Sequence, residues 1–262
     1  MEIMYIANEG FLIRSGNTKI LIDALFGKFE SDWCDVPSAE MVEKMETATE
    51  PFDDIDLILI THAHVDHFNA EIVTEHLLRN EAALLICPQQ VTQALEKMTS
   101  YEIFSDRVKE ITPEYEVGSQ NIDVKGMSIK VWRLRHAAYF IESEETGQMY
   151  NKHENVQNLG FTIAIDHKTI FHGGDWGYDG TGESTSPLEA EIIDVAFLGP
   201  GAYLRLYDPS NRVTDWSRKP SNSILMHLYP AGNLEELTEQ QKNAVSETTV
   251  FKSPTEVKSF GD

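Results

Sequence analysis

Short runs of apolar residues, either continuous or alternating with polar residues, recur along the chain between turn-forming residues. Runs of this length and pattern predict β-strands. We expect strands at residues 2–7, 10–14, 18–23, 56–61, 83–87, 121–125, 128–136, 159–166, 168–172, 194–198 and 223–227. The run 56–61 is almost continuously apolar, so we expect this strand to be buried on both faces of a sheet.

Apolar residues with helical spacing fall between these strands. They predict helices at residues 38–47, 67–79, 89–98 and 234–245. Pro88 stands just before the third helix, and Asn233 is a suitable N-cap for the fourth. Strands with interspersed helices predict sheets whose outer faces are covered by helices.

Composition indicates a soluble globular protein. The chain has 262 residues, of which 41% are hydrophobic and 24% charged, and no linker or repeat divides it, so we expect one domain at 1–262. No apolar run reaches the roughly 18–20 residues that cross a bilayer. The start of the chain lacks the features of a secretion signal, so we expect a cytoplasmic protein, although a leader already removed would leave no trace. Two cysteines are too few for a disulfide scaffold.

The net charge of −22 narrows the choice of partners. Such a surface repels phosphate backbones and anionic lipids, so we expect a small-molecule substrate and neither nucleic acid nor membrane as a partner. A homo-oligomer remains open. One stretch, 201–219, is basic and aromatic. It is either a solvated surface loop or a place where Arg205 and a neighbouring tyrosine bind phosphate or carboxylate.

Four potential metal ligands follow the apolar strand 56–61 within six residues: His62, His64, Asp66 and His67. Neutral imidazole and carboxylate are ligands that suit zinc and similar divalent ions. A polar loop that is rich in histidine by chance is the simpler interpretation. The density of ligands directly after a buried strand argues against it and predicts a metal site.

The run Thr61-His-Ala-His-Val-Asp-His-Phe68 resembles the H-x-H-x-D-H signature of the metallo-β-lactamase superfamily. Further similar segments follow the family's order at Lys19–Asp23, Arg135-His136, Phe171–Asp175 and Ser223–His227. The resemblance implies the metallo-β-lactamase fold. This is a mixed α/β (α+β) four-layer αββα sandwich with the metals at one edge of the sheets.

The resemblance also implies two divalent metal ions, most readily zinc, with manganese or iron as alternatives. One ion would be held by His62, His64 and His136, the other by Asp66, His67 and His227, and Asp175 would bridge them. These ligands plus a shared water complete two catalytic sites. A hydroxide between two cations has a pKa near about 7 or below, so it is a nucleophile at neutral pH.

The expected reaction is hydrolysis of an ester, lactone or phosphodiester bond in a small anionic molecule. His67 and Asp175 resemble the lactonase, phosphodiesterase and thioesterase branches rather than true β-lactamases. Length and the start at Glu9–Ile13 look most similar to the ascorbate-6-phosphate lactonase-like branch. Asp66 or Asp175 would manage the proton. Two alternatives stay open: a mononuclear iron oxidoreductase similar to persulfide dioxygenases, and a metal-binding protein without turnover.

Further residues are candidates around this site. Asp23 is expected to orient a ligand histidine by accepting its other ring N–H, or else to be a turn residue at a strand end. His172 precedes Asp175 by three residues and either supports the site in this way or packs as an ordinary strand residue. His153 is expected to overhang the site and touch substrate. Tyr203 or Tyr229 would donate a hydrogen bond to the developing oxyanion.

Overall fold

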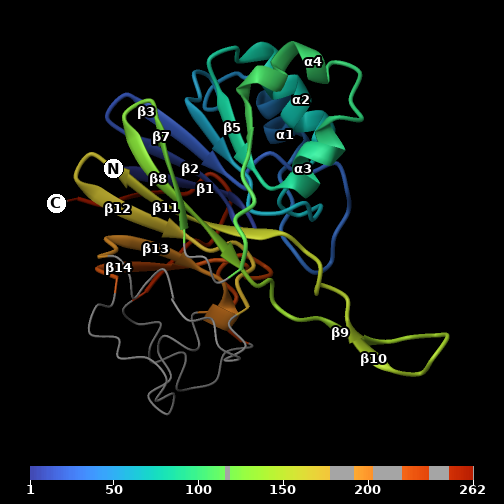
Figure 1. Cartoon of the computed structure of the whole chain (residues 1–262). Helices are drawn as coiled ribbons and strands as arrows, with labels where there is room; N and C mark the ends of the chain where they lie inside the picture. The colour runs from blue at the N-terminus through green and yellow to red at the C-terminus, as the bar shows by residue number, and fades with distance from the viewer. Residues whose placement is uncertain (116–118, 178–191, 203–219, 236–247, 262) are drawn as a thin grey trace.

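Two seven-stranded sheets stacked face to face form the framework of the protein in the computed structural model (Figure 1). The structure describes residues 1–115, 119–177, 192–202, 220–235 and 248–261. The first sheet has the spatial order β16 (Val257–Ser259), β1 (Glu2–Ala7), β2 (Gly10–Ser15), β3 (Thr18–Ile22), β4 (Leu57–Leu59), β5 (Leu84–Cys87) and β6 (Val108–Glu110).

The second sheet has the order β15 (Thr249–Val250), β14 (Asn222–Leu225), β13 (Val195–Leu198), β12 (Lys168–His172), β11 (Asn158–Ile165), β8 (Met127–Leu134) and β7 (Ser119–Val124). In each sheet, antiparallel strands lead into parallel ones: β3 to β6 are parallel in the first and β12 to β15 in the second. A hairpin of β9 (Phe140–Glu142) and β10 (Met149–Asn151) projects from the body (Figure 1).

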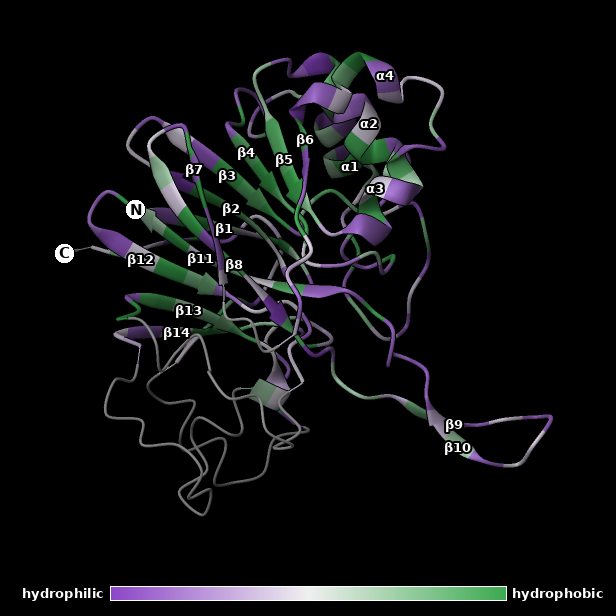
Figure 2. Ribbon diagram, viewed as in Figure 1, coloured by the Kyte–Doolittle hydropathy of each residue, from purple (hydrophilic) through white to green (hydrophobic). Residues whose placement is uncertain are grey.

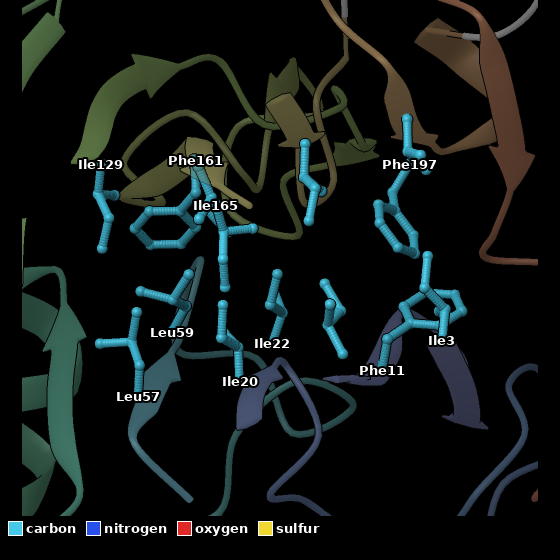
Figure 3. Close-up of a cluster of buried hydrophobic side chains, with 14 of the residues drawn as sticks. Ile3, Phe11, Ile20, Ile22, Leu57, Leu59, Ile129, Phe161, Ile165 and Phe197 are labelled. Atoms are coloured by element: carbon cyan, nitrogen blue, oxygen red, sulfur yellow. The ribbon is translucent and has the colours of Figure 1, made fainter. Parts of the chain in front are cut away.

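The main core lies between the inner faces of the two sheets. Phe11 and Leu59 of the first sheet and Phe161 and Phe197 of the second belong to one buried cluster, and each is fully shielded from solvent. Figure 3 shows side chains from both sheets pointing toward one another across this layer. The strands carry most of the hydrophobic colour in Figure 2, as expected for elements buried between layers.

Helices cover the outer face of the first sheet. They are α1 (Ala39–Thr47), α2 (Ala70–Arg79), α3 (Gln89–Leu95), α4 (Tyr101–Phe104) and the short 3-10 helix η1 (Ser105–Arg107). Ile72 and Leu77 of α2 pack with Leu21 and Leu85 of the sheet. Within the described ranges, no helix is long and apolar enough to span a bilayer.

The outer face of the second sheet has its own apolar cluster. Trp132, Phe171 and Leu225 belong to it, together with Ala202 from the helical residues 200–202. The helix predicted at 234–245 lies almost entirely outside the described residues. Two sheets and a helical layer therefore agree with the expected sandwich, and the second outer layer is described only at 200–202.

Several predicted boundaries were wrong, in ways that matter for the site. The helix expected from residue 67 begins at Ala70, because Asn69 accepts hydrogen bonds from the backbone of Glu71 and Ile72 as an N-cap. The strand expected over 56–61 forms ladder pairs only at β4, so the ligand-rich segment between β4 and α2 is a loop. The strand expected to reach His227 ends at Leu225, and the one expected to reach His136 ends at Leu134.

Candidate metal centre

The segments that follow four strands converge at one end of the two sheets. His62, His64, Asp66 and His67 follow β4 of the first sheet. His136 follows β8, Asp175 follows β12 and His227 follows β14, all from the second sheet. The structure brings all seven predicted ligands together in two neighbouring clusters.

The first cluster consists of three imidazoles that face one another. His64 Nδ1 lies 3.1 Å from His62 Nε2 and 3.2 Å from His136 Nε2. The Oδ2 atom of Asp175 lies 3.0 Å from His136 Nε2 and 3.7 Å from His62 Nε2. These four side chains offer three nitrogen atoms and one oxygen atom at a common point.

The second cluster consists of Asp66, His67 and His227. The Oδ2 atom of Asp66 lies 3.4 Å from His67 Nε2 and 3.7 Å from His227 Nε2. Asp175 also reaches this cluster, with its Oδ1 atom 3.5 Å from His67 Nε2 and 3.4 Å from His227 Nε2. The two oxygens of Asp175 are therefore divided between the clusters.

Asp23 lies behind both clusters and fixes a histidine of each. Its Oδ2 atom accepts hydrogen bonds from His67 Nδ1 at 3.0 Å and from the Thr61 hydroxyl at 2.6 Å. The Thr61 oxygen in turn lies 2.9 Å from His62 Nδ1. With Nδ1 donating in both rings, the Nε2 lone pairs face the clusters, as a metal ligand requires. His136 Nδ1 is held in the same sense by the Ala137 carbonyl at 2.8 Å.

The turn between β1 and β2 closes the site from another side. The Asn8 side-chain amide donates to Asp66 Oδ2 at 2.9 Å, and the backbone carbonyl of Asn8 accepts from the backbone N–H of His227 at 3.3 Å. The neighbouring carbonyl of Glu9 accepts from His172 Nε2 at 3.1 Å, while His172 Nδ1 accepts from Gly174 N at 3.2 Å. His172 thus ties this turn to the backbone just before Asp175.

Gly174 has to be glycine for this geometry. Its φ is +56°, and a Cβ there would lie 2.7 Å from the Thr61 hydroxyl oxygen and 2.5 Å from Asn158 Oδ1. A side chain at this position would push apart the segments that carry Asp175 and His62. The glycine directly before Asp175 in the sequence therefore serves a close approach.

The two clusters differ electrostatically. Burial lowers the pKa of His62 well below its usual value and that of His64 to about 4, so both rings are neutral at physiological pH. In the second cluster, burial disfavours the protonated ring of His67, but the nearby Asp66 and Asp175 raise the pKa of this ring well above its usual value. Burial likewise opposes ionisation of Asp175, yet His227 and His67 lower its pKa well below the usual value. The neutral imidazoles of His62 and His64 and the ionised carboxylate of Asp175 are the forms that bind cations.

Sequence reasoning missed Glu9 as a site residue. Its side chain is fully buried, and its carboxylate lies within 4.8 Å of ligand atoms of His67 and Asp175. Burial raises the pKa of Glu9 well above its usual value, and the nearby Asp175 adds to this. The available signal was an acid placed between two apolar strands, next to Asn8 and Gly10.

The predicted substrate residues have different outcomes. The His153 ring stands beside the first cluster, with its centroid 4.8 Å from that of His64 and 4.3 Å from that of His136. Its Nδ1 lies 3.1 Å from the Ala137 carbonyl. Tyr229 follows His227 by two residues and is exposed. Tyr203 and Arg205 lie outside the described residues, so their expected contacts stay predictions.

Comparisons with known proteins show the family of this chain. The family described as a β-lactamase superfamily domain matches residues 18–237. A UPF0173 metal-dependent hydrolase of Pelotomaculum thermopropionicum is 27% identical over 95% of this chain and 93% of its own length. A UPF0173 metal-dependent hydrolase of Staphylococcus haemolyticus is 22% identical, with 95% of each chain covered.

Solved structures show the same architecture. Igni18, a metallo hydrolase from Ignicoccus hospitalis, has a TM-score of 0.62 at 18% identity, covering 100% of this chain and 98% of its own. The metallo-β-lactamase fold protein YhfI of Bacillus subtilis has a TM-score of 0.62 at 14% identity, covering 98% and 99%. The short form of human tRNase Z reaches 0.58 at 15% identity, with 100% of each chain covered. These likenesses confirm the predicted fold.

Proposed function

Because this chain belongs to the β-lactamase superfamily domain family, we propose that it is a metal-dependent hydrolase whose centre holds two divalent cations. One observation carries the number of cations: the two oxygens of Asp175 face two separate clusters of ligand atoms. A mononuclear iron site, as in a persulfide-oxidising enzyme, would leave the second cluster without a purpose.

The residues present fit such ions. His67 Nε2 is buried and has no hydrogen-bond partner among the described residues, as expected for an atom that awaits a cation. In this proposal, His62, His64 and His136 hold one ion, Asp66, His67 and His227 hold the other, and Asp175 holds both. Imidazole and carboxylate donors of this kind suit zinc, with manganese or iron as alternatives.

The bound ions would supply a water of lowered pKa and polarise an oxygen of the scissile group. The chain's own residues do the rest. Asp23 and Asn8 keep the ligands oriented through the hydrogen bonds to His67 and Asp66. Asp66 or Asp175 accepts the proton that a hydrolytic water releases, since neighbouring histidines keep both carboxylates ionised.

We further propose that the substrate is a small anionic molecule with an ester, lactone or phosphodiester bond. The support for a substrate contact is His153, whose ring lies beside those of His64 and His136 without being one of the ligands. Its Nδ1 is engaged with the Ala137 carbonyl, so Nε2 is the ring atom that we assign to substrate contact. Tyr229 is a second candidate contact because of its position just after His227.

Elemental mass spectrometry on protein purified without added metal tests this function. We expect about two equivalents of zinc or manganese per chain, and chelator-sensitive hydrolysis of a generic phosphodiester or lactone. Asp175→Ala should lose most of both equivalents, while the control Asp56→Asn, whose acid binds Lys19 and Lys125 away from the centre, should keep them. One equivalent of iron, or no metal after reconstitution, would contradict the proposal.

A further inference from the structure

Glu9 is the one carboxylate at the centre that the ligand scheme above leaves without a task. It stands in the turn that joins β1 to β2, and its side chain is 0% exposed. Both Oε1 and Oε2 are buried without a hydrogen-bond partner among the described residues. A buried carboxylate without partners is costly, so its presence requires an explanation.

The position of Glu9 is fixed rather than accidental. The His172 side chain holds its carbonyl at 3.1 Å. Gly199, which follows β13, leaves room for the side chain, since a Cβ there would lie 3.3 Å from Glu9 Oε1. The carboxylate is thereby placed within 4.8 Å of ligand atoms of His67 and Asp175. His67 Nε2 is itself buried without a hydrogen-bond partner in the described part of the chain.

A cation would satisfy both His67 Nε2 and the Glu9 carboxylate, because it binds the imidazole lone pair and neutralises the negative charge of the carboxylate. We propose that Glu9 is a further ligand of the ion in the second cluster, and that this ion is an oxygen-preferring one such as Mn²⁺. The inference rests on the proposed function, since it assigns a ligand and a metal preference to the same centre.

The donor sets of the two clusters support this asymmetry. The first cluster offers three imidazole nitrogens and one oxygen of Asp175. The second offers the nitrogens of His67 and His227 and an oxygen of Asp66, and Glu9 adds an oxygen within 4.8 Å of ligand atoms of His67 and Asp175. Imidazole suits zinc, whereas a set rich in carboxylate oxygens suits manganese and similar harder ions.

The test measures binding of Mn²⁺ and Zn²⁺ separately by calorimetric titration of the metal-free chain. Glu9→Gln keeps the shape of the side chain and removes the charge. We expect binding of the second equivalent of Mn²⁺ to weaken by more than about 100-fold, beyond the ~10–100-fold typical of a residue that only orients a ligand. Zn²⁺ at the first equivalent should bind as in the natural chain. Glu2→Gln, at the exposed end of β1, is the matched control.

Selectivity separates a ligand from a structural residue. Asp23→Asn disturbs orientation only and should weaken both metals alike, whereas Glu9→Gln should weaken Mn²⁺ more than Zn²⁺. If Glu9→Gln does not fold, the natural chain still tests the proposed metal preference of the second cluster. Given one equivalent of each metal, it should bind the Mn²⁺, seen as loss of the electron paramagnetic resonance signal of free Mn²⁺; free Mn²⁺ alongside bound zinc would overturn the assignment.

The outcomes also separate this inference from the proposed function. If the natural chain binds two equivalents of metal and Glu9→Gln binds each metal as tightly as the natural chain does, Glu9 is not a ligand, but the proposed dinuclear hydrolase stands. If the natural chain binds no divalent metal, both proposals fail.

Discussion

At the scale of single residues, Asp23 has the widest influence on the centre. It accepts from His67 directly and reaches His62 through Thr61. An Asp23→Asn substitution should therefore lower metal affinity at both clusters by about 10–100-fold, because an amide cannot accept from both donors with the same strength. Competition against a chromogenic chelator measures this, with Asp56→Asn as the control. Unchanged affinity would mean that the rings are held by other contacts.

His153 offers a second test at this scale. The ring lies beside the first cluster without belonging to it. His153→Ala should raise KM by roughly 10-fold, the equivalent of about 1.4 kcal/mol for one lost substrate hydrogen bond, and should leave the metal content unchanged. Steady-state kinetics and elemental analysis of the same preparation check both parts. A loss of metal would show that His153 supports the ligands instead.

The sequence predicted some residues of the centre and missed others. His62, His64, Asp66 and His67 stand together after an apolar strand, so their shared chemistry is visible in the sequence itself. Glu9 and Asn8 are ordinary polar residues in a turn, and nothing local indicates that the turn is buried against segments more than 50 residues away. Their roles depend on tertiary contacts with Asp66 and Asp175.

At the scale of elements, the pair α1 and α2 is joined by a buried histidine. His76 of α2 donates from Nδ1 to the Met45 carbonyl in the last turn of α1 at 2.7 Å. Burial lowers the pKa of His76 to about 4. Burial thus outweighs the Met45 hydrogen bond, which by itself favours the protonated ring.

This pKa gives a pH dependence of stability. The unfolded chain takes up a proton at His76 near a pKa of about 6.5, whereas the folded chain resists it down to about 4. The contribution is fully present above about 6.5 and is lost as the pH falls, by about 3 kcal/mol in all. Relative to His76→Gln, the metal-free protein should lose this much stability between pH 7 and pH 4. Denaturant titrations across this range measure it, and parallel curves would contradict it.

The helices and strands that the sequence predicted correctly are those long enough to show a repeating apolar pattern. Helix α2 and strands such as β8 and β11 are long enough for the apolar pattern to be read. Strands β6, β15 and β16 have only two or three residues each, and α4 has four, so no period can be recognised in them. The sequence predicted His67 in a helix and His136 and His227 in strands because apolar residues flank them, whereas the structure has all three outside these elements.

At the scale of the whole molecule, the net charge of −22 opposes the anionic substrate that we propose. Long-range repulsion slows the approach of an anion and is screened by salt, with a Debye length of about 10 Å at 0.1 M. The kcat/KM for an anionic substrate should therefore rise severalfold between about 10 mM and 150 mM ionic strength. A neutral lactone serves as the control and should show little change. A fall with salt for the anion would indicate a local basic path to the centre.

The first sheet is finished by the last strand of the chain. β16 pairs antiparallel with β1, so that Glu2 lies opposite Ser259, and Figure 1 shows the two ends of the chain on the same side of the molecule. During synthesis on a ribosome, β1 must then keep an open edge until residues beyond 257 have emerged. An unpaired edge is a template for association with other chains. While the protein is being synthesised, most of its core can form before β16 is available. During that time the unpaired edge of β1 must be kept from associating with other chains, either by chaperones or by rapid pairing with β16.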